Sequence, residues 1–152
     1  MTIRKLESGD IEVASRLIES VSDRYIRDDF SKLGYQNYKQ KVLDDGMRGN
    51  MEEGFMYWAA FESEALIGII SVKPPSHLFN LFVHMDHQRK GVAMQLWKHV
   101  LSQLHPKTVT VYSSSYAVVL YEKLGFVSNG SKIVSNELTC YPMLWSEDQT
   151  RA

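Results

Sequence analysis

The sequence has very little cysteine and no long apolar run. Its single cysteine, Cys140, excludes an internal disulfide framework and is compatible with a reducing compartment, so we expect a cytoplasmic protein. No apolar run approaches the roughly 20 residues that a membrane-spanning helix needs, and the N-terminal segment lacks the apolar core of a signal peptide. A soluble protein without a membrane partner is therefore expected.

The sequence also lacks an excess of charge of either sign. Seventeen Lys and Arg residues stand against eighteen Asp and Glu residues, which gives a formal net charge of −1. Such a chain has no general attraction for a nucleic-acid backbone, so nucleic acid is not an expected partner. Neither the spacing of the five histidines nor Cys140 indicates a metal site, and we expect no metal. Any positively charged site must be local.

The pattern of apolar residues predicts one domain over residues 1–147, followed by a short C-terminal tail at 148–152. Within residues 91–104, for example, Val92, Leu96 and Val100 recur at helical spacing. The expected order is a strand at 2–6, a helix after 10, one or two short helices in 23–42, a loop at 44–54, strands at 55–61, 65–72 and 77–85, a helix at 91–104, a strand at 108–112, a helix at 116–124, and strands at 126–134 and 137–145. This order predicts a three-layer α/β or α+β fold with a mixed central sheet of about seven strands and about four helices.

The segment HQRKGVAMQLW, residues 87–97, places cations directly before a glycine that opens a predicted helix. A helix that begins at glycine exposes unpaired N–H groups and the positive end of its dipole, and the missing side chain lets an anion approach closely. Arg89 and Lys90 are unfavourably placed at this end of a helix unless an anion neutralises them. The segment therefore predicts a phosphate site, although the two best-known phosphate-loop patterns are both absent from the chain.

Three segments of the chain resemble parts of one enzyme family. Residues 88–93 match the pattern Q/R-x-x-G-x-G/A and resemble the pyrophosphate-binding signature of the GCN5-related N-acetyltransferase (GNAT) family, whose members bind acetyl-CoA. Residues 116–126 resemble the A-x-x-x-Y-E-K-L-G-F segment of the same family, and TCYPMLW near the C-terminus is similar to the closing strand of a bacterial branch. Two departures are that Ala93 replaces the more frequent second glycine and that Ser115 stands where many members have Asn.

The resemblance implies a GNAT-type fold and a set of cofactor-binding residues. In this family the pantetheine arm of CoA lies between the third central strand and the strand after the signature helix. Backbone groups of the third strand would hold the arm and the thioester, and the glycine-containing loop would hold the pyrophosphate. The implied cofactor-binding residues are Leu81, Phe82, Val83, Gln88, Arg89, Lys90, Gly91, Val92, Ala93, Ser115 and Tyr121.

The resemblance also implies catalytic roles. Tyr121 would protonate the departing thiolate, since a phenol of pKa about 10 and a thiol of pKa about 8.5 are close enough for transfer through a short hydrogen bond. A packing role is favoured by the helix alone, whereas the YEKLGF context favours the acid. His77 lies six positions before Val83, where histone-acetylating members carry a catalytic Glu. His77 is a candidate for the general base. The sequence is equally compatible with a His77 that faces solvent, in which case a chain of waters would remove the proton. Glu52 and Glu53 are further candidates.

The expected function is acetyl-CoA-dependent transfer of an acetyl group to a primary amine, by direct attack in a ternary complex and without an acyl-cysteine. One alternative is a non-catalytic acyl-CoA-binding module of the same fold, which the presence of Tyr121 disfavours. A nucleic-acid-binding domain is a weaker alternative that the net charge disfavours. A small molecule or a peptide are both compatible as the acceptor, and Asp28, Asp29, Glu52 and Glu53 would suit a cationic one. The apolar segment TCYPMLW is compatible with a homodimer.

Overall fold

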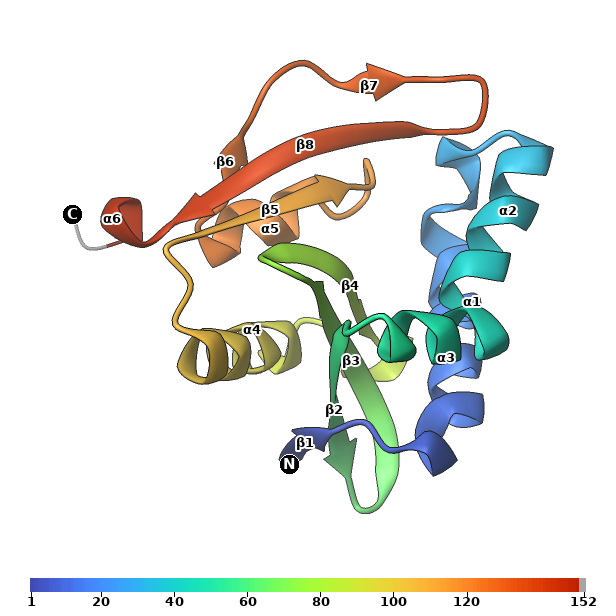
Figure 1. Cartoon of the computed structure of the whole chain (residues 1–152), viewed down its shortest axis with the longest axis vertical. Helices are drawn as coiled ribbons and strands as arrows, with labels where there is room; N and C mark the ends of the chain where they lie inside the picture. Colours follow the sequence, from blue (N-terminus) through green and yellow to red (C-terminus); the bar gives the residue numbers. More distant parts are fainter. Residues whose placement is uncertain (151–152) are drawn as a thin grey trace.

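The computed structural model describes residues 1–150 and contains one mixed β-sheet with helices on both faces (Figure 1). The strand order is β1-β2-β3-β4-β5-β8-β6, and β7 also pairs with β8. Only β4 and β5 run parallel, whereas the other paired strands are antiparallel. The strands are Thr2–Lys5 (β1), Met56–Glu62 (β2), Ala65–Lys73 (β3), His77–Val83 (β4), Thr108–Ser113 (β5), Val127–Ser128 (β6), Ile133–Val134 (β7) and Thr139–Ser146 (β8).

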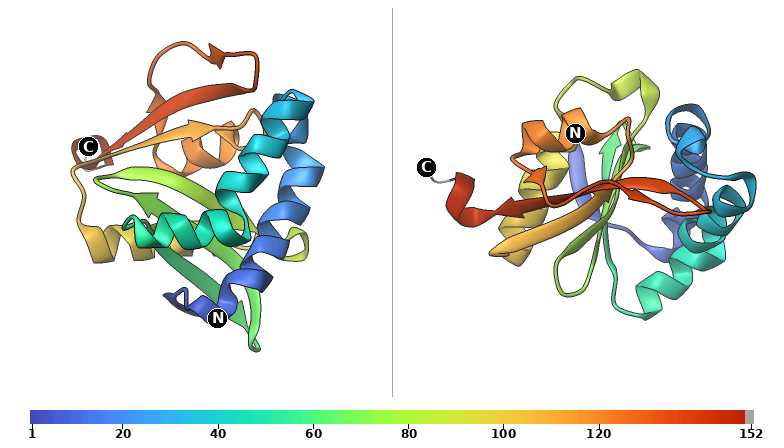
Figure 2. Two further views of the ribbon diagram at one scale, coloured as in Figure 1. Left: turned by 45° about the vertical axis from the view of Figure 1, so that its right-hand side comes forward. Right: turned by 90° about the horizontal axis from the view of Figure 1, so that it is seen from above.

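The helices form the two outer layers, which confirms the three-layer prediction (Figure 2). One face of the sheet is covered by α1 (Ile11–Tyr25), α2 (Lys32–Val42) and α3 (Asp44–Glu52), and the other by α4 (Val92–Leu104) and α5 (Val118–Leu124). A short helix, α6 (Glu147–Thr150), follows β8. It includes the first residues of the predicted tail, while residues 151–152 lie outside the described residues.

Two apolar cores, one on each face, hold the helices to the sheet. Among the predicted apolar positions of α1 and α4, Ile18, Leu96 and Val100 are fully buried. Between them β3 is buried from Leu66 to Val72, as expected for a central strand that is covered on both sides. Each large apolar side chain buried in this way contributes about 1.5–3 kcal/mol. The two cores fix the strands that surround the site.

The prediction of a loop at residues 44–54 was wrong, because this segment forms α3. The two glycines inside α3, Gly46 and Gly49, argue against a helix, at a cost of about 1 kcal/mol each relative to alanine. Gly46, however, packs so closely against α2 that a Cβ atom there would lie 2.1 Å from the carbonyl oxygen of Gln40. Met47 is completely buried, and Met51 packs against the same core. Burial of the methionines therefore outweighs the local preference.

The predicted strand at residues 126–134 was also wrong in its extent. Within this segment only β6 and β7 form strands, both of which pair with β8, and the chain turns between them. Gly130 adopts a φ of 110° in this turn, and the N–H of Asn129 donates to the carbonyl of Pro142 at 2.9 Å. Phe126 precedes the strand and packs against Trp97 in the core. Some apolar residues of this segment therefore lie in the core and others in edge strands. The alternation of apolar and polar residues does not distinguish the two.

β4 pairs with β5 only through its first two residues, His77 with Thr110 and Leu78 with Val111, which lie in the middle of β5. Beyond this point the two strands diverge (Figure 1). The register between β3 and β4 also shifts here and leaves Phe79 without a partner in β3. A bulge of this kind bends a strand and disrupts its ladder. The edge of β4 that would otherwise pair with β5 is consequently open along most of its length.

Candidate functional site

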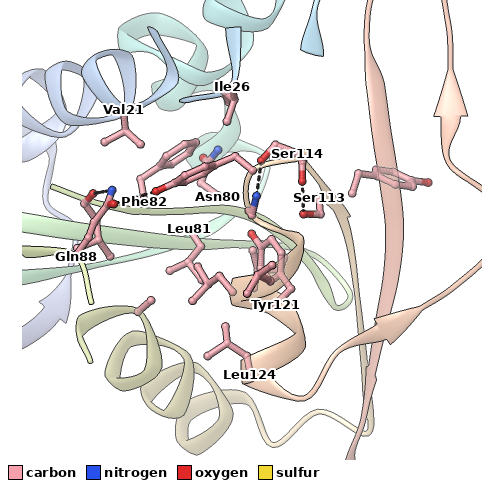
Figure 3. Close-up of a pocket in the computed structure, with 18 of the residues that line it drawn as sticks. Val21, Ile26, Asn80, Leu81, Phe82, Gln88, Ser113, Ser114, Tyr121 and Leu124 are labelled. Carbon is pink, nitrogen blue, oxygen red and sulfur yellow. Dashed lines mark hydrogen bonds between the residues drawn. The ribbon is translucent and has the colours of Figure 1, made fainter. Parts of the chain in front are cut away.

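A cavity of about 780 Å³ lies at the opening between β4 and β5. Its lining comes from both faces of the sheet. Figure 3 shows Val21 and Ile26 on one side of β4 and Tyr121 and Leu124 on the other. Because these residues belong to the two separate helical layers, the cavity crosses the sheet through the opening. Two ligands that enter from opposite faces can therefore meet inside it.

The glycine-containing loop forms one end of the cavity. Gly91 caps α4 with a φ of 86°, and Arg89 also has a positive φ, of 63°. The first hydrogen bond of α4 runs from the N–H of Gln95 to the carbonyl of Gly91, so the three preceding N–H groups have no partner within the helix. A Cβ atom added at Gly91 would meet no other atom within 4 Å. The helix therefore begins at open space lined by backbone donors and one guanidinium.

Gln88 holds this loop to both sides of the opening. Its Nε2 donates to the carbonyl of Val83 at 3.0 Å, and its Oε1 accepts from the hydroxyl of Tyr116 at 2.9 Å. The ring of Tyr116 stacks on Tyr25, with ring centroids 4.3 Å apart. The loop before α4, the end of β4 and the start of the α5 region are thus joined through one amide.

A second link crosses the mouth of the cavity through Asp29, which follows α1. Its carboxylate accepts hydrogen bonds from the N–H of Ser115 at 2.8 Å and from the Oγ of Ser115 at 2.7 Å. Ser115 itself does not line the cavity, whereas Asp29 does. The two residues are 86 positions apart in the chain, and no sequence signal relates them. Ser115 positions this loop, and its contact with CoA stays a prediction.

Tyr121 lies where its hydroxyl reaches the cavity. The residue is 5% exposed, and its ring packs edge-on against Phe126. The hydroxyl makes no hydrogen bond to any described residue. No described side chain has a polar atom that is both fully buried and unpartnered, so this hydroxyl is open to the cavity that Tyr121 lines. Burial raises the pKa of Tyr121, with a smaller contribution from Tyr38, and the phenol stays protonated at neutral pH.

His77 lies at the closed end of the opening between the strands. Its Nδ1 is in a hydrogen bond of 2.8 Å with Oγ1 of Thr110, and its ring centroid is 5.0 Å from that of Tyr112. Burial, and to a smaller extent the charge of Lys73, lower the pKa of His77 from its ordinary value of 6.5. His77 is therefore neutral at neutral pH and lines the cavity. Glu52, which the sequence offers as a further candidate base, does not line the cavity.

Asn80 is a cavity residue that the sequence analysis missed. It is 4% exposed, and its Oδ1 accepts from the Oγ of Ser71 at 3.1 Å. Its amide nitrogen has no hydrogen-bond partner among the described residues and lies at the cavity. The available signal was a single polar residue inside the otherwise apolar strand HLFNLFV. A buried amide with unused donors is suited to bind a ligand carbonyl.

Most of the predicted site residues come together. The predicted cofactor-binding residues, together with His77 and Tyr121, all line the cavity except Lys90 and Ser115, whereas the further base candidates Glu52 and Glu53 lie outside it. Within the described residues, no group of three or more His, Cys, Asp or Glu side chains could hold a metal ion. No helix in residues 1–150 is both long and apolar enough to cross a bilayer.

Comparison with known protein families identifies the fold. A family model described as an acetyltransferase (GNAT) domain matches residues 13–147. The chain belongs to the GNAT acetyltransferase family. Human N-acetyltransferase 8 is similar to this GNAT chain, with 30% identity over 96 residues that cover 52% of the chain and 41% of the human protein. The match thus spans less than half the length of that relative.

Solved structures show the same GNAT fold. A GCN5-related N-acetyltransferase from Rhodopseudomonas palustris has a TM-score of 0.80 at 20% identity, covering 95% of this chain and 94% of that one. A PaiA N-acetyltransferase from Thermoplasma acidophilum, in complex with coenzyme A, has a TM-score of 0.77 at 19% identity, covering 95% and 98%. At these identities the likeness concerns the fold.

Proposed function

We propose that this GNAT protein transfers an acetyl group from acetyl-CoA to a primary amine by direct attack in a ternary complex. The observation that carries the proposal is the cavity that crosses the sheet between β4 and β5. One end holds the helix start with its free backbone donors, and the other end opens among α1 and α2. Such a passage lets donor and acceptor approach one carbonyl from opposite faces, which replaces a bimolecular encounter by a positioned one.

The residues present fit the pyrophosphate and arm of CoA. The N–H groups of Val92, Ala93 and Met94 and the guanidinium of Arg89 offer donors and positive charge to an anion. The open space in front of Gly91 admits a phosphate without a clash. The open edge of β4 and the amide of Asn80 offer hydrogen bonds to the amide groups of the arm. Lys90 stands outside the cavity and would act through its charge alone.

Acetyl-CoA supplies a thioester carbonyl that an amine can attack. The amine nitrogen forms a bond to the carbonyl carbon, the carbon–sulfur bond breaks, and the amine loses one proton while the sulfur gains one. Negative charge develops on the carbonyl oxygen during this exchange. Backbone N–H groups at the bulge around Phe79 and along the open edge of β4 would stabilise that charge, because the register shift leaves Phe79 without a partner in β3.

Tyr121 is the proposed proton donor to the leaving sulfur. Its hydroxyl has no competing partner in the described part of the chain, so it is available to a ligand. Burial raises the pKa of Tyr121, which alone would weaken it as an acid. The same apolar surroundings also disfavour a thiolate and raise the pKa of a thiol. The two pKa values therefore move together, and transfer remains feasible.

His77 is the proposed acceptor of the amine proton. Its lowered pKa keeps the ring neutral, so one nitrogen can accept a proton while the other stays bonded to Thr110. A chain of waters is the alternative path for this proton. The pH dependence of kcat/KM in His77→Gln distinguishes His77 from a water chain as the proton acceptor.

Release of CoA thiol from acetyl-CoA tests the function. The panel of acceptors would contain alkylamines, polyamines, aminoglycosides, amino acids and lysine peptides, and binding of acetyl-CoA would be followed separately by its effect on the melting temperature. We expect binding and amine-dependent thiol release. Binding of acetyl-CoA with no thiol release for all the amines in the panel would contradict the transferase and support the acyl-CoA-binding module.

A further inference from the structure

The half of the cavity that faces α1 and α2 has an apolar wall. The wall carries rings from the segment after α1, from α2 and from β4, and it is completed by the chain before and at the start of β8. Phe79 packs toward the same face as the core of α1. Phe30 and Tyr38 contact each other with ring centroids 4.8 Å apart. The residues of this wall are Val21, Ile26, Phe30, Tyr38, Phe79 and Leu138.

Negative charge is nearly absent from the cavity. Asp29 is the one acidic residue among the described residues that line it. Both oxygens of its carboxylate are already bonded to Ser115. Asp28, Glu52 and Glu53, which the sequence offers for a cationic acceptor, do not line the cavity. The hydroxyl of Tyr38 is likewise engaged, in a hydrogen bond of 3.0 Å with Ser22.

We infer that the acceptor is a primary amine carried on an apolar alkyl or aryl group, and that this group packs against the apolar wall. The inference rests on the proposed function and names its substrate class. A buried ammonium without a counter-charge is strongly unfavourable, whereas each methylene that the wall removes from water strengthens binding about fourfold. A polyamine would place its second ammonium against Val21, Ile26 or Phe30, where no free carboxylate receives it.

A matched pair of amines tests this inference. Hexylamine and 1,5-diaminopentane have the same number of non-hydrogen atoms and differ by a terminal methyl against an ammonium. With acetyl-CoA held at saturation, we expect kcat/KM for hexylamine to exceed that for the diamine by at least tenfold, after correction for the two equivalent amines of the diamine. Phenethylamine should be accepted in the same range as hexylamine.

Leu138 is a position where a charged substitution can be compared with an uncharged one of the same shape. Its side chain is half-buried in the wall, and its backbone carbonyl accepts from the N–H of Ser135 at 3.0 Å, a contact that a new side chain leaves in place. Leu138→Glu adds a carboxylate, and Leu138→Gln adds the same shape without charge. We expect Leu138→Glu to shift the preference toward the diamine by at least tenfold relative to Leu138→Gln.

Binding gives a readout that does not depend on turnover. Titration calorimetry of the CoA-saturated protein should detect hexylamine at a lower concentration than the diamine. A diamine that is bound and acetylated as well as hexylamine, or a Leu138→Glu variant whose preference equals that of Leu138→Gln, would overturn the inference and leave the transferase standing. Binding of acetyl-CoA with neither amine bound or acetylated would also overturn it. Loss of acetyl-CoA binding itself would instead refute the proposed function.

Discussion

Replacement of Tyr121 by Phe separates the two roles that the structure gives this residue. The ring packs against Phe126 in the core, and the hydroxyl opens to the cavity without a hydrogen bond to the described part of the chain. Phe keeps the ring and removes only the oxygen. The variant should therefore fold normally and lose the proposed proton donor.

The expected magnitudes differ for stability and for rate. A hydroxyl without an intramolecular partner contributes little to folding, so the free energy of unfolding should change by less than about 1 kcal/mol. Loss of a general acid typically lowers a rate by about 10²-fold or more, which corresponds to about 2.7 kcal/mol in the activation free energy. Acetyl-CoA affinity should stay close to the wild-type value.

Tyr57→Phe is the matched control. Tyr57 is as buried as Tyr121, but it lies outside the cavity and its hydroxyl accepts a hydrogen bond from Asn50 at 3.2 Å. This variant should lose stability by about 1 kcal/mol and keep its turnover rate. The contrast distinguishes a hydroxyl that acts in the reaction from one that acts in the fold.

The assay follows thiol release under single-turnover conditions, so that product release does not hide the chemical step. Urea unfolding of both variants gives the stability comparison. A Tyr121→Phe rate within about threefold of wild type would refute the general acid. If Tyr121→Phe does not fold, the hydroxyl of Tyr121 has a structural role, which refutes its assignment as a hydroxyl without a structural partner.

Three further predictions follow from individual contacts. The pKa of His77 is lower in the folded chain than in the unfolded chain, so the free energy of unfolding should fall as the pH drops below 6.5, and His77→Gln should reduce this fall in urea unfolding. The same variant should lose kcat/KM near neutral pH and recover it at high pH, where the amine deprotonates unaided. Asp29→Ala removes both hydrogen bonds to Ser115 and should weaken acetyl-CoA binding severalfold in calorimetry, because the loops at the mouth are no longer joined. Gly34→Ala would bring a Cβ atom to 2.1 Å from the carbonyl oxygen of Glu137 and should cost about 1–3 kcal/mol in urea unfolding.

Those elements with a strong local signal were predicted well from the sequence. The spacing of Val92, Leu96 and Val100 gave α4, and these side chains are buried as the pattern requires. Gly91 was placed at a helix start, and its φ of 86° agrees with the use of glycine there. Local patterns specify such features because the residues that decide them are neighbours in the chain.

Features that depend on distant contacts were not predictable in this way. Gly46 lies in a helix whose methionines are buried in the core, and α2 packs too closely on Gly46 to leave room for a side chain, whereas a glycine count indicates a loop. The link between Asp29 and Ser115 joins segments 86 residues apart. The apolar character of the cavity wall that faces α1 and α2 is likewise a property of the folded chain, since Asp28 is charged in the sequence but lies outside the cavity.

Two glycines in the same backbone state show whether CoA binds where α4 begins at the cavity. Gly91 and Gly130 both have positive φ, of 86° and 110°, and a Cβ atom at either would meet nothing within 4 Å. Only Gly91 lines the cavity. Calorimetric titration with acetyl-CoA should therefore show binding abolished in Gly91→Glu, where a carboxylate occupies the pyrophosphate position, and unchanged in Gly130→Glu. Equal affinity for acetyl-CoA in folded Gly91→Glu and wild-type protein would mean that the pyrophosphate does not bind at the start of α4.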